Sequence, residues 1–166
     1  MTSKRTKLFT AGYRGFSLIE VLVALLALSI GLLGLAALQT TSLQYNTGSY
    51  YRTQATLLAY DIIDRMRANG DAVISGGGYD VGDVSTVSST NNCDTTSCSS
   101  TELAAFDLSK WFARAAATLP IAQVPPPTVT VDASRQARVT INWTERDLTM
   151  NQSWNVQVCV SGVTCR

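Results

Sequence analysis

The sequence of 166 residues contains no histidine, and its four prolines all lie at or beyond position 120. Without histidine the chain lacks the most frequent general acid–base residue and a common zinc ligand. It also lacks a G-x-S-x-G motif and a G-x-x-x-x-G-K-[ST] motif, so neither a nucleophile elbow nor a nucleotide-binding loop is expected. We therefore predict that the protein is not an enzyme and that it uses no cofactor.

Acidic residues are missing from positions 1–15, and charged residues of either sign are missing from Val21 to Leu38. The N-terminal tail has a net charge of +4, whereas the rest of the chain carries nine basic and twelve acidic residues. A helix over the apolar run Phe16–Leu38 would span about 35 Å, enough to cross a hydrocarbon core of roughly 30 Å. Because basic residues precede this run, we expect a cytoplasmic N-terminus, with residues 39–166 across the membrane.

Only four cysteines are present, and all of them fall on the expected exported side: Cys93, Cys98, Cys159 and Cys165. An oxidising compartment favours two disulfides, and four cysteines allow three connectivities. Pairing of nearest neighbours gives Cys93–Cys98 and Cys159–Cys165, and the other two connectivities stay open. Zinc is the alternative, but closed zinc sites favour tighter cysteine pairs and often include histidine, so no metal is expected.

Glu20 is the one charged residue inside the apolar run. A charge within a bilayer costs at least ~2.5–3.5 kcal/mol near the centre, so such residues are usually paired and functional. A secretory signal peptide has a shorter apolar core of about 7–15 residues, with its cleavage site after that core. A simple membrane anchor usually begins with basic or aromatic residues. Neither interpretation accounts for the glutamate.

The stretch Gly15-Phe16-Ser17-Leu18-Ile19-Glu20, preceded by a short basic leader, resembles the class III signal of type IV pilins and type II secretion pseudopilins. The resemblance implies that a prepilin peptidase removes the cytoplasmic leader, residues 1–15, by cleaving between Gly15 and Phe16. It also implies N-methylation of Phe16. In this family the glutamate engages the N-terminal amine of a neighbouring subunit, a role that we assign to Glu20. The alternative is a carboxylate near the membrane surface without a partner.

The helical pattern of the transmembrane and assembly segment, residues 16–38, continues through residues 39–69. Apolar residues at spacings of three and four share one face there: Tyr51, Ala55, Leu58, Ile62 and Met66. Asp61 and Arg65 should form an exposed i, i+4 pair. Asn69-Gly70 provides a helix stop, so one helix of about 80 Å is expected from Phe16 to Asn69.

Two glycines and a serine weaken the first half of this helix: Ser29, Gly31 and Gly34. Some pilins partly unwind near this position within the filament, and the resemblance suggests the hypothesis that Ser29–Gly34 unwinds on assembly. The alternative is that the glycines let two helices approach closely.

The remaining residues predict the exported head, which would complete an α+β, pilin-like fold. Residues 70–100 are rich in Gly, Ser, Thr and Asn and indicate a loop, in which the spacing of Asp80, Asp83 and Asp94 matches no calcium-binding EF-hand. A short helix is expected at 101–119, capped by Ser100 or Thr101. Its apolar face would contain Leu108, Phe112, Ala115 and Leu119.

After Pro125-Pro126-Pro127 the apolar residues alternate, which predicts three antiparallel strands within residues 128–166. The alternating positions are Val129, Val131, Val139, Ile141, Trp143, Trp154, Val156, Val158 and Val160. We expect this small sheet to pack its apolar face against the amphipathic half of the long helix, with Trp143 and Trp154 in core or cross-strand positions.

Residues 52–72, 107–111 and 139–145 resemble PilV-type minor pilins, also called type IV pilus modification proteins. The resemblance implies a subunit that joins other minor pilins and a tip adhesin in a complex priming pilus assembly, with the major pilin and an inner-membrane assembly platform as further partners. Such a complex supports adhesion and twitching motility. The chain would first occupy the bacterial inner membrane, with its head in the periplasm, and later the pilus.

Two other functions are compatible with the same signal. A minor pseudopilin of a type II secretion system shares the cleavage motif and the architecture, and neighbouring genes would distinguish the two. A DNA-capturing pilin would need a basic head, whereas residues 70–166 carry six basic and nine acidic residues. A local patch of Arg135, Arg138 and Arg146 is the remaining route to DNA, so no nucleic acid partner is expected.

Overall fold

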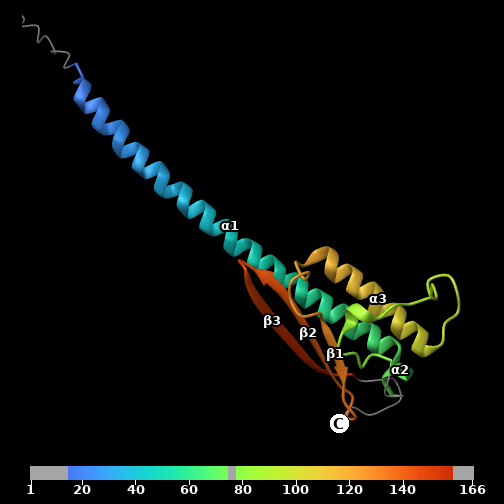
Figure 1. The fold of residues 1–166 in the computed structure, drawn as a ribbon. Coiled ribbons are helices and arrows are strands. Elements are labelled where there is room, and N and C mark those ends of the chain that lie inside the picture. The colour runs from blue at the N-terminus through green and yellow to red at the C-terminus, as the bar shows by residue number, and fades with distance from the viewer. Residues whose placement is uncertain (1–14, 75–77, 159–166) are drawn as a thin grey trace, which may run out of the picture. The chain divides into compact units, whose positions relative to one another are not determined.

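The computed structural model describes residues 15–74 and 78–158, and it divides the chain into two compact units, Met1–Tyr45 and Asn46–Arg166. Helix α1 (Leu18–Ala68) runs from the first unit into the second (Figure 1). Its bounds lie within two residues of the predicted helix. No proline interrupts it, and Asn69 follows it directly.

The first unit consists, in its described part, of the extended residues 15–17 and the first half of α1. Each residue from Gly15 to Tyr45 is exposed, and this half is long and apolar enough to span a membrane. Since it has no apolar partner within its own unit, the length and the composition both fit a segment that is buried by lipid or by other chains.

The second unit, or head, contains two short helical segments, one longer helix and a sheet. They are α2 (Gly70–Ile74), the 3-10 turn η1 (Val84–Thr86), α3 (Ser100–Thr118), β1 (Thr128–Val131), β2 (Gln136–Glu145) and β3 (Leu148–Gln157). The sheet is antiparallel, with the order β1-β2-β3. Together with the long apolar helix, this arrangement confirms the α+β, pilin-like fold.

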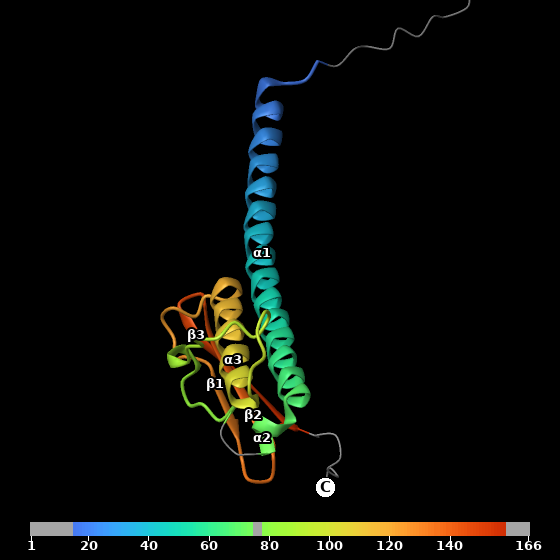
Figure 2. The ribbon, with the colours of Figure 1, turned by 90° about the vertical axis from the view of Figure 1, so that its right-hand side faces the viewer.

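The second half of α1, helix α3 and the sheet enclose one core (Figures 1 and 2). Its largest fully buried side chains come from all three layers and from the segments that connect or follow them: Ile62, Ile63, Met66, Tyr79, Val84, Leu108, Trp111, Val129, Val139, Ile141, Trp143 and Val158. The buried residues of the described chain all lie between Gly48 and Val158. The described part of the head therefore has a core of its own, so we expect a fragment of residues 46–166 to fold independently.

The predicted faces are largely correct. On α1, Ala55, Leu58, Ile62 and Met66 are buried, while Tyr51 is half-buried. Trp154 and Val156, both expected to face the core, are only half-buried because they lie on the outermost strand. Val160 lies outside the described residues.

Two predicted boundaries in the head are wrong. Strand β3 begins at Leu148, whereas the alternating apolar pattern of the last predicted strand starts only at Trp154, which made residues 146–152 the expected connection. Arg146 and Asp147 both have positive φ angles, 51° and 63°, which fits the tight two-residue turn of a β-hairpin and lets the strand resume at once. The segment expected as a loop, residues 70–100, contains α2, η1 and a β-bridge between Val81 and Val129.

Helix α3 begins one residue earlier than predicted, and its N-cap is Ser99 rather than Ser100 or Thr101. The Ser99 side chain accepts a hydrogen bond from the Glu102 amide, and the Glu102 carboxylate accepts one from the Ser99 amide. This reciprocal capping box satisfies two donors that a helix terminus otherwise leaves unpaired.

Candidate functional site

The candidate assembly segment runs from Gly15 through the first turns of α1. Residues Gly15–Ser17 are not helical, and the chain enters the helix at Leu18, where the Ser17 carbonyl accepts hydrogen bonds from the Glu20 and Val21 amides. The Phe16 side chain is 84% exposed. The predicted cleavage position thus precedes the helix directly, in backbone that forms no helical hydrogen bonds of its own.

Glu20 lies in the first turn of α1, where a carboxylate is favoured by the helix dipole. Phe16 and Glu20 line one shallow hollow together with Val21, Ala24, Leu25 and Leu28. The part of the chain that the structure describes supplies no ion-pair partner for Glu20. An exposed carboxylate within an apolar surface can therefore accept a cationic group from another chain.

The stretch Ser29–Gly34 is helical in this structure. The Ser29 hydroxyl donates to the Leu25 carbonyl at 2.7 Å, as serine commonly does within apolar helices. A Cβ atom added at Gly31 or Gly34 would meet nothing within 4 Å. No contact within the described chain therefore requires glycine at these two positions.

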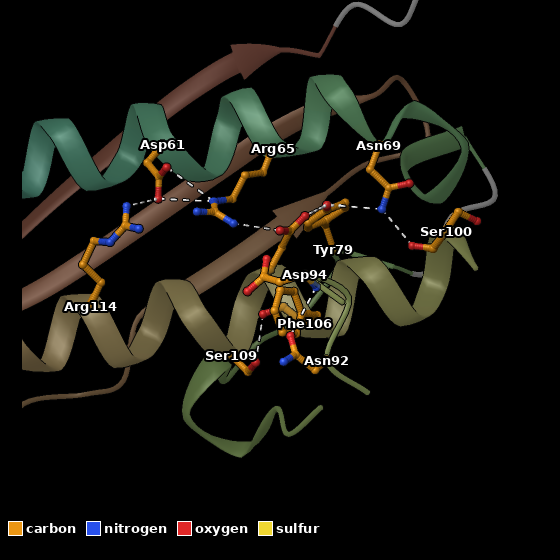
Figure 3. A network of polar contacts seen from close by, with 11 residues as sticks. Asp61, Arg65, Asn69, Tyr79, Asn92, Asp94, Ser100, Phe106, Ser109 and Arg114 are labelled. Carbon is orange, nitrogen blue, oxygen red and sulfur yellow. Dashed lines mark hydrogen bonds and ion pairs between the residues drawn. The ribbon is translucent and has the colours of Figure 1, made fainter. Parts of the chain in front are cut away.

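In the head, a network of polar side chains joins α1, α3 and the segment around Tyr79 (Figure 3). Arg65 on α1 donates to Asp107 on α3 at 2.8 Å, and the Tyr79 hydroxyl donates to the other oxygen of Asp107 at 2.7 Å. Asn69 donates to Tyr79 at 3.3 Å and to the Ser100 carbonyl at 2.7 Å. Asp107 is a buried carboxylate whose two oxygens are both satisfied.

The same network reaches the surface through Asp61. Its carboxylate accepts from Arg65 at 3.4 Å and from Arg114 of α3 at 3.0 Å. The predicted Asp61–Arg65 pair is therefore present, but it is half-buried rather than exposed, and Arg65 makes its shorter contact with Asp107. Two ion pairs therefore join α1 to α3: Arg65 with Asp107, and Asp61 with Arg114.

Two groups in this network have shifted pKa values. Burial raises the pKa of Tyr79, and the hydrogen bond to Asp107 raises it further. Burial lowers the pKa of Arg65, but the hydrogen bond to Asp107 and the charges of Asp61 and Asp107 outweigh this, so the net shift is upward. Both shifts favour a neutral tyrosine and a charged arginine around one carboxylate.

A disulfide joins Cys93 and Cys98, as predicted, with 5.6 Å between the two Cα atoms. Its second cysteine immediately precedes Ser99, the N-cap of α3. Two residues before Cys93, the Asn91 side chain donates to Glu102 at 2.7 Å. The disulfide loop is thereby held at both ends near the start of α3, by Asn91 on one side and by Ser99 on the other. Cys159 and Cys165 lie outside the described residues.

The acidic residues of the loop have structural partners. Asp80 accepts from the Val131 amide of β1 at 3.2 Å, and Asp83 caps η1 by accepting from the Ser85 amide at 2.9 Å. Within residues 15–74 and 78–158, no three His, Cys, Asp or Glu residues are grouped as metal ligands. Asp80 and Asp83, two of the three acids considered for calcium binding, therefore have structural roles as acceptors of backbone hydrogen bonds.

The three arginines considered for DNA binding do not form one patch. Arg135 directly precedes β2 and Arg146 directly follows it, so roughly 30 Å of strand separates them. Arg138 lies near the first end of β2, where it donates to Asn155 at 2.8 Å. This spacing gives no concentrated basic surface.

The sequence did not predict the polar contacts of three residues in the head network: Asn69, Tyr79 and Asp107. Asp107 stands between Phe106 and Leu108, both buried on α3, and an acid within an apolar helix face indicates a paired carboxylate. Its partners come from segments 28 and 42 positions away, and no local pattern identifies them.

Two family models match the chain. The model described as type IV pilin Tt1218 matches residues 37–109, and the model described as the prokaryotic N-terminal methylation motif matches residues 11–36. The second match contains Gly15, Phe16 and Glu20, and the first extends from the middle of α1 into α3. No match was found among curated proteins or among solved structures.

Proposed function

We propose, from the type IV pilin family that the two matches support, that this chain is a minor pilin of the PilV type. It is made with a leader that a prepilin peptidase removes between Gly15 and Phe16. The new amino terminus at Phe16 is then methylated. The match to the N-terminal methylation motif and the non-helical backbone before Leu18 support this processing.

The observation that carries the proposal is the state of Glu20. Its carboxylate lies in an apolar segment whose described residues offer it no ion-pair partner. Cleavage creates an α-amino group at Phe16, and the same group on a neighbouring subunit can pair with Glu20 in a low-dielectric environment. Docking between subunits would then be favoured by one charged pair and by the exposed apolar surface of α1 around it.

The minor-pilin role rests on the sequence resemblance of residues 52–72, 107–111 and 139–145 to PilV-type proteins. In this role the chain joins other minor pilins and a tip adhesin near the pilus tip and primes assembly. It supports adhesion and twitching motility rather than forming the bulk of the fibre. The N-terminus would begin in the cytoplasm and the head in the periplasm.

The Glu20 role is tested by co-purification of the full-length chain with the other pilins encoded beside it. Glu20→Ala and Glu20→Gln should both reduce the recovered partners at least tenfold, because neither side chain carries a charge. Ser42→Ala, on the same helix but away from the apolar terminus, serves as the control and should leave recovery unchanged. Undiminished recovery with both Glu20 variants would contradict the charged pairing.

The place in a tip complex is tested separately, with the soluble head, residues 46–166. We expect it to bind at least one other minor pilin of the same operon in a pull-down. Failure to bind any of them would contradict the tip-complex role. A pseudopilin of a type II secretion system is the second candidate, and recovery of secretion pseudopilins in place of minor pilins would favour it.

A further inference from the structure

The two edges of the head's sheet differ in how their backbone groups are used. At the β1 edge, Val81 and Val129 exchange two backbone hydrogen bonds of 2.6 and 3.0 Å, and Asp80 accepts from the Val131 amide. The other edge is β3 (Figure 1), and within residues 15–74 and 78–158 no strand or bridge pairs with its outer side. One edge is therefore covered by the chain itself and the other is open.

The register of the hairpin shows which backbone groups face outward. In an antiparallel pair, only every second residue exchanges hydrogen bonds with the neighbouring strand. The bond from the Val158 amide to the Arg135 carbonyl, 3.1 Å, fixes this alternation. The residues at even positions therefore bond to β2, namely Leu148, Met150, Gln152, Trp154 and Val156. The residues between them direct both N–H and C=O away from β2: Thr149, Asn151, Ser153 and Asn155.

The open edge has none of the features that usually prevent strand pairing. Strand β3 is ten residues long, whereas protected edge strands are short or carry lysine, proline, a bulge or an inward-pointing charge. Its sequence, LTMNQSWNVQ, contains no charged residue, no proline and no glycine, and its register with β2 is continuous from end to end. An edge of this kind is ready to accept another strand.

The side chains of β3 define what such a strand must contain. Met150, Trp154 and Val156 pack against the core but are only half-buried, because the sheet ends at this strand. On the opposite face, Thr149, Asn151, Ser153 and Asn155 are exposed and uncharged. A strand added here would cover the first row with apolar side chains and continue the second row with hydroxyl or amide side chains.

We propose that the outer edge of β3 is a docking site for an extended strand of a different pilus subunit, in which apolar residues alternate with uncharged polar ones. The identity of the partner as a pilus subunit rests on the proposed function, whereas the openness of the edge does not. The added strand makes main-chain hydrogen bonds to Thr149, Asn151, Ser153 and Asn155 and buries Met150, Trp154 and Val156.

A second copy of this chain is a poorer occupant. Antiparallel self-pairing of two β3 strands requires a two-fold axis perpendicular to the sheet. Strand β3 runs alongside the second half of α1 (Figures 1 and 2), so this axis would point the Asn46 ends of the two heads in opposite directions. Both of these ends lead to residues that enter one membrane from the same side.

The first test measures backbone amide exchange by NMR in the isolated head, residues 46–166. The amides of Thr149, Asn151, Ser153 and Asn155 should exchange at least a hundredfold faster than those of Met150, Gln152 and Trp154. Slow exchange at all seven would overturn the proposal. Loss of that protection on dilution would identify a second copy on the edge, and protection lost on removal of residues 159–166 would identify the chain's own terminal segment.

The second test measures co-purification of minor pilins with the full-length chain carrying Asn151→Pro. Proline removes one outward-facing N–H and places its ring where the added strand would lie, while the bonds to β2 are retained. The matched control is Asn151→Ala, which removes the same side chain, including its bond to Asn142, and keeps the N–H. We expect at least a tenfold loss of partner with proline and less than a twofold loss with alanine.

Thr149→Pro and Thr149→Ala repeat the comparison at the first outward-facing position, in case Asn151→Pro does not fold. Equal recovery for a folded proline variant and its alanine control overturns the docking site but leaves the minor-pilin function standing. If the wild-type chain recovers no pilin, the proposed function fails and the proposed occupant fails with it.

Discussion

Arg65 on α1 and Asp107 on α3 form an ion pair of 2.8 Å across the interface between the two helices of the head. The Asp107 side chain is only 9% exposed, and its second oxygen accepts the Tyr79 hydroxyl. Such a carboxylate is stable in the interior only while its partners stay in place, since a buried charge without a partner is costly. Apolar contacts hold α3 against α1, and the ion pair in addition fixes the position of one helix along the other.

Removal of the charge at this position should destabilise the head. Asp107→Asn leaves Arg65 without its closest anionic partner, and we expect the free energy of unfolding to fall by about 2 kcal/mol. Asp64→Asn is the control, because Asp64 pairs with Arg67 at 2.7 Å on the exposed face of α1. Its cost should stay below about 0.5 kcal/mol. Urea unfolding of residues 46–166 measures both, and equal costs would contradict the role of Asp107.

Stability at alkaline pH should depend on Tyr79. Its pKa in the folded head is raised above the value of about 10 in an unfolded chain. The unfolded chain therefore loses this proton first, so the stabilisation is fully present below pH ~10 and is lost as the pH rises above it. We expect the difference in unfolding free energy between wild type and Tyr79→Phe to shrink above that pH.

Tyr60→Phe is the control for this comparison, since Tyr60 is 53% exposed on α1. The difference between wild type and this variant should stay constant across the same pH range. Denaturant unfolding at pH 8, 9, 10 and 10.5 measures both differences. A constant difference for Tyr79→Phe as well would contradict burial of its hydroxyl beside Asp107.

Loss of the Cys93–Cys98 disulfide should have a local effect. The bond closes a loop of six residues whose second cysteine directly precedes the N-cap of α3, so its removal frees this loop at the point where the helix begins. In the double variant Cys93→Ser/Cys98→Ser, hydrogen exchange should accelerate at the start of α3, from Ser99 to Leu103, and stay unchanged on the sheet. Accelerated exchange across the whole head would contradict a local role. Peptide mapping under non-reducing conditions tests the separate prediction that Cys159 and Cys165 are bonded.

The periodic features were predictable from the sequence because each depends on neighbours within one element. Spacings of three and four placed Leu58 and Ile62 correctly on the buried face of α1, and alternation placed Val139, Ile141 and Trp143 in the core. The two cysteines nearest to each other in sequence form the disulfide. At the N-terminal end of α1, the residues of the candidate assembly segment were proposed from a short motif, and their roles stay predictions.

Features that depend on distant residues were not predictable. Trp111 is fully buried and donates to the Leu58 carbonyl at 2.8 Å, across 53 positions of sequence, yet the helical pattern of α3 gave no indication of that bond. The start of β3 was missed because it depends on backbone angles at Arg146 and Asp147, which are not glycines. The open edge became visible only once the order of the strands was known.

The last prediction concerns the two glycines in the first half of α1, Gly31 and Gly34. Gly31→Ala and Gly34→Ala should each stabilise α1 in the unassembled chain, by up to ~1 kcal/mol, since the added methyl group meets no neighbour there. In the assembled filament the same changes should reduce incorporation, whether Ser29–Gly34 unwinds or packs closely against another helix.

Serine at the same positions separates the two explanations. It is larger than alanine but favours the helix less, by about 0.5 kcal/mol. If the stretch must unwind, Gly34→Ser should be incorporated better than Gly34→Ala, because it resists unwinding less. If two helices must approach closely there, the larger serine should be incorporated no better. Incorporation is measured by immunoblot of sheared pili, and a filament map showing unbroken helix from Ser29 to Gly34 would refute the unwinding hypothesis.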